Sequence, residues 1–186
     1  MPNKLYMLLL GATVPGRFTE QHDIFFGIAE NLHALVPEIK SSWKGAKVHI
    51  DAWRVVTQVN NFHIEVVPSG IESATGPALF FINLGGYKKD EFDEFHYKVL
   101  SVATDKGEAV RESKQTTFYK HMGFGKANSH IDDKYGVDVD DIYSITDILS
   151  PAFREQFDLR ITESAGPSDQ IHLGYFKLDK LQSIGT

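Results

Sequence analysis

The feature that most constrains the fold of this chain is an internal repeat. Shifted by 74 positions, residues 5–29 align without a gap with residues 79–103, and seven of the 25 aligned positions are identical. Chance would give roughly one or two identities in such a window. Several of the other positions exchange one apolar residue for another, as Leu8 and Ile82 do. An apolar run that recurs in mid-chain is expected to be a strand and not a secretory signal.

The repeat predicts how the chain is divided. Residues 1–67 are interpreted as copy one and residues 79–150 as copy two, and the connector 68–78 is rich in Pro, Gly and Ser. Residues 151–186 repeat neither copy. They contain two candidate strands separated by turn residues, which predicts a C-terminal β-hairpin packed on the repeats.

The second half of the repeat matches more loosely than the first. The motif H-I-D at 49–51 returns at 130–132, an offset of 81, and residues 59–63 match residues 139–143 at an offset of 80. We therefore expect an insertion of seven residues in copy two, within residues 120–129.

Each copy is predicted to be a ββαββ unit. Apolar runs that end at Gly11 and at Gly85-Gly86 are typical of buried strands, and we interpret these glycines as turn residues. Residues 47–56 and 62–67 are expected to pair as a hairpin in copy one. The predicted fold class is α+β, a tandem duplication of a ββαββ unit in a pseudo-two-fold arrangement, with the C-terminal β-hairpin added.

One helix is expected in each copy. In copy one, Asn31 is a good N-cap for a helix whose middle is kinked by Pro37. In copy two, Thr104 or Asp105 is expected to cap a helix that buries Thr117 and Phe118, among others, and ends at Gly123.

Composition argues against several classes of function. The chain has no cysteine, which excludes disulfides, zinc–thiolate sites, iron–sulfur clusters and cysteine nucleophiles. Its net charge is −6 and no basic stripe is present, so binding to nucleic acid is not expected. No window approaches the ~20 apolar residues that span a bilayer, so no membrane association is expected. We expect a cytoplasmic protein that forms a homo-oligomer, with a small molecule or a protein as its partner.

Polar residues that are kept in both copies are the candidate functional residues. Two motifs are kept: E-x-H, at 20–22 and 94–96, and H-x-D, at 49–51 and 130–132. In each motif the two named side chains are two positions apart, which places them on one face of a strand. Imidazoles and carboxylates gathered there suit zinc, manganese or iron. The candidate metal ligands are Glu20, His22, His49 and Asp51 in copy one, and Glu94, His96, His130 and Asp132 in copy two. Copy two is the more acidic, so a cation is expected there first.

Two other readings of these motifs remain open. The histidines can pair with the carboxylates as structural elements, or they can bind a ligand or act in catalysis without a metal. No H-E-x-x-H, G-x-S-x-G or EF-hand pattern is present, and the sequence indicates no organic cofactor. The first functional hypothesis is therefore a non-enzymatic binding or interaction module, and the competing hypothesis is a metal-binding protein or metal-dependent enzyme.

The repeated segments resemble a known family. They resemble the family called domain of unknown function 1543. The segments that carry the resemblance are LLLG and NLGG, EQHDIFFGIAENL, HIDAWR, and FFINLGGYKKDEFDEFHYKVL. The resemblance extends over residues 4–150 and implies a two-copy bacterial member. It implies no activity, because none is assigned to the family.

Overall fold

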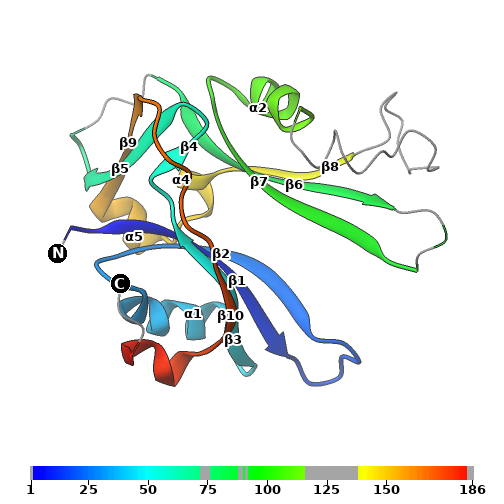
Figure 1. Cartoon of the computed structure of the whole chain (residues 1–186). Coiled ribbons are helices and arrows are strands. Elements are labelled where there is room, and N and C mark those ends of the chain that lie inside the picture. The colour runs from blue at the N-terminus through cyan, green and yellow to red at the C-terminus, as the bar shows by residue number, and fades with distance from the viewer. Residues whose placement is uncertain (1, 72–75, 88–89, 91, 116–137, 184–186) are drawn as a thin grey trace. The chain divides into compact units, whose positions relative to one another are not determined.

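The computed structural model of the chain describes residues 2–71, 76–87, 90, 92–115 and 138–183 (Figure 1). In these residues, ten strands form three antiparallel sheets, accompanied by a few short helices. The predicted α+β class is therefore confirmed. Among the described residues, no helix combines the length and the apolar character needed to cross a membrane.

The chain divides into two compact units. The first contains residues 1–72 together with 149–186, and the second contains residues 73–148. The C-terminal segment is thus part of the first unit.

The main sheet of the first unit is built around its first strand. Strand β1 (Lys4–Thr13) lies between β2 (Gln21–Ala29) and β3 (Lys47–Val55), and β10 (His172–Lys177) pairs with the other edge of β3 (Figure 1). Because β1 is the central strand, its alternate side chains are buried on one face of the sheet in a cluster that includes Tyr6, Leu8, Leu10, Ile50 and Trp53.

Short helices complete this core. The 3-10 helix η1 (Leu32–Leu35) leads directly into α1 (Val36–Ser42), and a second 3-10 helix, η2 (Leu178–Ser183), follows β10. The predicted start at Asn31 is confirmed, since its side-chain oxygen accepts a hydrogen bond from the backbone N–H of Ala34 at 3.1 Å. Pro37 does not kink the middle of a helix. It lies in the first turn of α1, where a backbone N–H has no helical partner to lose.

The Asn31 cap makes a measurable contribution to stability. Replacing Asn31 by Ala is expected to lower the free energy of unfolding by about 1 kcal/mol, because the N–H of Ala34 loses its side-chain acceptor and keeps only the backbone carbonyl of residue 31. Urea unfolding followed by tryptophan fluorescence measures the change, since Trp43 and Trp53 both belong to the first unit. Ser41→Ala, at an exposed position of α1, is the control, and an equal loss in both variants would contradict the assignment.

The second sheet of the first unit corrects two predicted hairpins. It has the order β4-β5-β9, with β4 (Gln58–Val59), β5 (Phe62–Pro68) and β9 (Phe157–Glu163). Strand β3 pairs with β1 and β10 and not with β5, so the hairpin predicted for copy one is wrong. The C-terminal β-hairpin is also wrong, because β9 pairs with β5 whereas β10 pairs with β3.

Asp169, in the segment between the two C-terminal strands, binds the chain at the start of β4. Its carboxylate accepts hydrogen bonds from the backbone N–H groups of Thr57 and Gln58 and from the Thr57 hydroxyl, at 2.6 to 3.2 Å. These contacts fix the segment that connects β9 in one sheet with β10 in the other. The helix α5 (Pro151–Gln156) precedes β9.

The second unit has one three-stranded sheet. Strand β6 (Ala78–Tyr87) lies between β7 (Glu94–Ala103) and β8 (Asp138–Ser144), and α2 (Lys106–Ser113) and α4 (Ile145–Ile148) complete the described elements. Asp105 caps α2 by accepting a hydrogen bond from the N–H of Glu108 at 2.8 Å, as one of the two predicted caps. Thr117, Phe118, Gly123 and the insertion expected within 120–129 lie outside the described residues.

Strand pairing is the same in the two units at matching positions. Lys4 pairs with Ala29 in the first unit. The residues 74 positions further on, Ala78 and Ala103, pair in the second unit. The pairing of β1 with β3 is irregular between Leu9 and Leu10. The pairing of β6 with β8 is irregular between Asn83 and Leu84, again 74 residues further on.

Candidate metal site

Two histidines face each other across the central strand of the first sheet. Gly11 on β1 pairs with His22 on β2 and with His49 on β3. Paired residues of neighbouring strands project from the same face of a sheet. The three-strand row His22–Gly11–His49 therefore brings the two imidazoles together over a position that has no side chain.

A β-bulge adds a carboxylate to this row. Leu10 pairs with Ile50 and Leu9 with Ala52, so Asp51 has no partner residue on β1. A bulge of this kind changes the direction of a side chain, and bulges are frequent beside functional sites. The Asp51 carboxylate reaches both histidines, and Glu20, just before β2, supplies a second carboxylate.

The four side chains predicted for copy one lie next to one another. His49 Nε2 lies 3.0 Å from Asp51 Oδ1 and 3.5 Å from Glu20 Oε1. His22 Nε2 lies 3.2 Å from Asp51 Oδ2 and 3.6 Å from Glu20 Oε2. Four donors bound to one ion at about 2.0–2.2 Å in tetrahedral geometry are about 3.3–3.6 Å apart. These four histidine–carboxylate distances are close to those values. The four side chains do not, however, offer single ligand atoms that all lie within 4.8 Å of one another, so the set is more open than a tetrahedral metal centre.

Burial separates His49 from the other three members. The side chain of His49 is only 5% exposed, whereas those of His22 and Glu20 are 46% and 42% exposed. His49 Nε2 and Asp51 Oδ2 are both buried atoms that make no hydrogen bond, although each lies near an oppositely polar atom. A buried polar group without a partner costs roughly 1–3 kcal/mol.

The glycines beneath the candidate sites are not turn residues. Gly11 and Gly85 lie inside β1 and β6, and both positions are crowded. A Cβ at Gly11 would come within 2.5 Å of His49 Nε2 and 2.6 Å of Asp51 Oδ2, and one at Gly85 would collide with the carboxylate of Asp140. Each glycine therefore leaves space for polar side chains from neighbouring strands.

The second unit gathers a smaller set. Glu94, His96 and Asp140 can each offer one ligand atom within 4.8 Å of the others, and all three residues are exposed. His96 Nδ1 lies 3.1 Å from Asp140 Oδ2, and His96 Nε2 lies 3.8 Å from Glu94 Oε2. The amide of Asn83 also lies 3.2 Å from His96 Nδ1.

Asp140 was missed by sequence reasoning. His130 and Asp132, the predicted ligands of copy two, lie outside the described residues. Gly85 pairs with Asp138 as Gly11 pairs with His49, so residues 138–140 hold the strand position of H-I-D. The matching of residues 59–63 with 139–143 is therefore wrong. The signal that could have found Asp140 is the D-x-D spacing at 138–140, which equals that of H-x-D.

The fold and site define an α+β protein with a cluster of histidines and carboxylates on a β-sheet. Residues 17–66 match the family described as Domain of Unknown Function (DUF1543), which confirms the expected family for that part of the chain. The matched segment contains Glu20, His22, His49 and Asp51.

The whole chain also resembles a solved structure. The crystal structure of protein Il1583 from Idiomarina loihiensis matches with a TM-score of 0.61 and 20% sequence identity, over 96% of this chain and 99% of that chain. At this identity the likeness supports the fold alone. No curated protein matches the chain in sequence.

Proposed function

We propose that this chain is a binding module for a divalent transition metal, held in the first unit by Glu20, His22, His49 and Asp51. One observation carries the proposal. His49 Nε2 and Asp51 Oδ2 are buried, lie over the same residue, Gly11, and make no hydrogen bond. A cation beside them would satisfy both atoms and would also offset the repulsion between two neighbouring carboxylates.

Structural pairing of histidine with carboxylate explains the geometry less well. A pairing hydrogen bond requires the imidazole N–H to point at one oxygen, and His49 Nε2 makes no such bond to either neighbouring carboxylate. A metal ion needs several donors around one point, and each of the two imidazoles here lies 3.0 to 3.6 Å from both carboxylates.

The donor set favours particular metals. Two imidazole nitrogens and two carboxylate oxygens suit zinc, and also manganese or iron, whereas the chain has no thiolate for softer ions. We propose zinc as the first candidate because four imidazole and carboxylate donors match the number and kind of ligands that it usually takes.

The second unit is proposed as a weaker site of the same kind. It offers Glu94, His96 and Asp140, all exposed, in place of four donors that include a buried histidine. The local excess of acidic residues is thus less important to our proposal than the number and burial of the donors.

We further propose that the two units are copies of one ancestral unit. Three observations share the offset of 74 residues: the sequence identities, the pairing of β1 with β2 and of β6 with β7, and the position of the bulge opposite β1 and β6. The pairing of β6 with β8 corresponds to that of β1 with β3, and both place an acidic residue, Asp51 or Asp140, at the bulge.

Zinc titration tests the metal proposal. Calorimetry of protein that was purified without a histidine tag and freed of metal is expected to show saturable zinc binding, and melting should shift upward on zinc addition. His22→Ala removes one donor from an exposed position and is expected to weaken zinc binding at least tenfold. His63→Ala, an exposed histidine on β5, is the matched control and should bind zinc like the unsubstituted chain.

Two results would contradict the metal proposal. One is the absence of bound transition metal in the purified protein, together with melting that neither zinc nor a chelator changes. The other is equal zinc affinity in His22→Ala, His63→Ala and the unsubstituted chain. The histidines would then be structural.

A further inference from the structure

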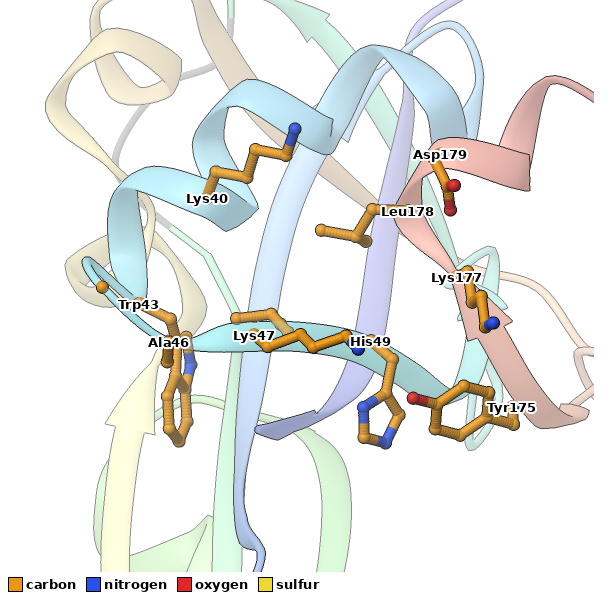
Figure 2. Close-up of a pocket in the computed structure, with 11 residues that line it drawn as sticks. Lys40, Trp43, Ala46, Lys47, His49, Tyr175, Lys177, Leu178 and Asp179 are labelled. Atoms are coloured by element: carbon orange, nitrogen blue, oxygen red, sulfur yellow. The ribbon is translucent and has the colours of Figure 1, made fainter. Parts of the chain in front are cut away.

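A cavity of about 550 Å³ lies in the first unit, between α1, the start of β3 and the end of β10 (Figure 2). Its walls include three lysines and three rings, contributed by Lys40, Trp43, Lys47, His49, Tyr175 and Lys177. A volume of this size is within the range of small-molecule sites.

The cavity carries an excess of positive charge. Lys40, Lys47 and Lys177 approach it from α1, β3 and β10 respectively, and Asp179 is the one carboxylate that lines it (Figure 2). In the part of the chain that the structure describes, none of these three lysines forms an ion pair within 4.0 Å. Three positive charges around a hollow with a single carboxylate leave an excess of positive charge, which attracts anions.

Aromatic rings complete the lining. Figure 2 shows Trp43 and Tyr175 at opposite ends of the strand segment 46–49. The ring of Tyr175 packs against that of His49, with centroids 4.1 Å apart. Rings at these positions supply flat apolar contact area to a bound organic molecule while the lysines hold its charge.

We infer that this cavity binds a small organic anion, a molecule with phosphate or carboxylate groups on a compact body. The three ammonium groups bind the oxyanion, and Trp43 and Tyr175 contact the body of the molecule. The inference does not depend on a bound metal. His49 lines the cavity and also belongs to the candidate metal site.

The test uses the full chain freed of metal on a chelating resin, because the probes themselves bind metals. Inorganic phosphate and citrate are titrated at low ionic strength, with calorimetry and tryptophan fluorescence as readouts. At least one probe is expected to bind saturably with Kd below about 1 mM. The stronger of the two identifies which oxyanion the cavity prefers. Added salt should weaken this binding because it screens the lysine charges.

A charge-matched pair of double variants gives the control. Lys47→Ala with Lys177→Ala removes two lining lysines and is expected to weaken probe binding at least tenfold. Lys44→Ala with Lys106→Ala removes the same charge from exposed positions outside the cavity and should leave affinity nearly unchanged. Circular dichroism melting verifies that both variants fold.

Two outcomes would overturn the inference. One is the lack of saturable binding of either probe up to about 10 mM. The other is an equal loss of affinity in both double variants, which would show general attraction to the surface charge. Zinc titration of the same variants separates this inference from the metal proposal, because neither pair of lysines contributes a donor to the metal site.

Discussion

Gly11→Ala is expected to weaken zinc binding by at least 100-fold while the protein remains folded. The new Cβ would lie 2.5 Å from His49 Nε2 and 2.6 Å from Asp51 Oδ2, closer than non-bonded atoms approach. Both atoms are at the ends of side chains, so they can move away without displacing the backbone. They would then move away from the other two candidate ligands, and a metal loses affinity when its ligands are displaced.

Gly27→Ala is the matched control for this substitution. Gly27 lies on β2, and a Cβ there would meet the side chains of Leu35 and Phe25 at 2.7 and 2.8 Å, among apolar atoms. We expect Gly27→Ala to lower the free energy of unfolding by about 1–3 kcal/mol and to leave zinc affinity unchanged. Calorimetry and urea unfolding of both variants measure the two effects. Unaltered zinc affinity in Gly11→Ala would contradict the site.

Leu8→Ala is expected to have the largest effect on stability. Leu8 is fully buried at the centre of β1, in the same cluster as Tyr6, Leu10 and Trp53. Removing a fully buried leucine side chain costs the transfer free energy of the lost atoms and leaves a cavity, together about 2–5 kcal/mol. Urea unfolding followed by tryptophan fluorescence reports on this cluster, because Trp53 belongs to it.

Leu173→Ala controls for the chemistry of the substitution. Leu173 lies on β10 of the same sheet, but it is 78% exposed. Its replacement is expected to change the free energy of unfolding by no more than about 0.5 kcal/mol. A loss at Leu8 as small as that at Leu173 would show that the cluster around β1 is not the core of the first unit.

The local part of the fold could be predicted from the sequence. Apolar runs identified β1 and β6, and the E-x-H residues were placed correctly beside the second strand of each unit. Asn31 and Asp105 were recognised as caps because an N-cap is a contact between residues two or three apart. These features depend on neighbours in the chain, which the sequence lists directly.

The pairing of distant strands could not be predicted in this way. The sequence placed β3 beside β5 and β9 beside β10, because strands that follow each other commonly form hairpins. Pairing of β3 with β1 and of β9 with β5 places these strands in two sheets, and the connecting segment is held by contacts of Asp169 with residues 111 or 112 positions away. No local pattern reveals such a contact.

The sequence by itself determined which residues compose the candidate metal site in the first unit, because E-x-H and H-x-D each place two side chains on one face of a strand. Only the tertiary structure decided that the two motifs meet. Their meeting requires β2 and β3 to flank β1 with Gly11 opposite both histidines, and a bulge to turn Asp51 toward them. The same bulge in the second unit places Asp140 beside His96. The physical reason is that the register between strands is set by backbone hydrogen bonds over the whole sheet, so one extra residue in one strand redirects a side chain that spacing alone cannot place.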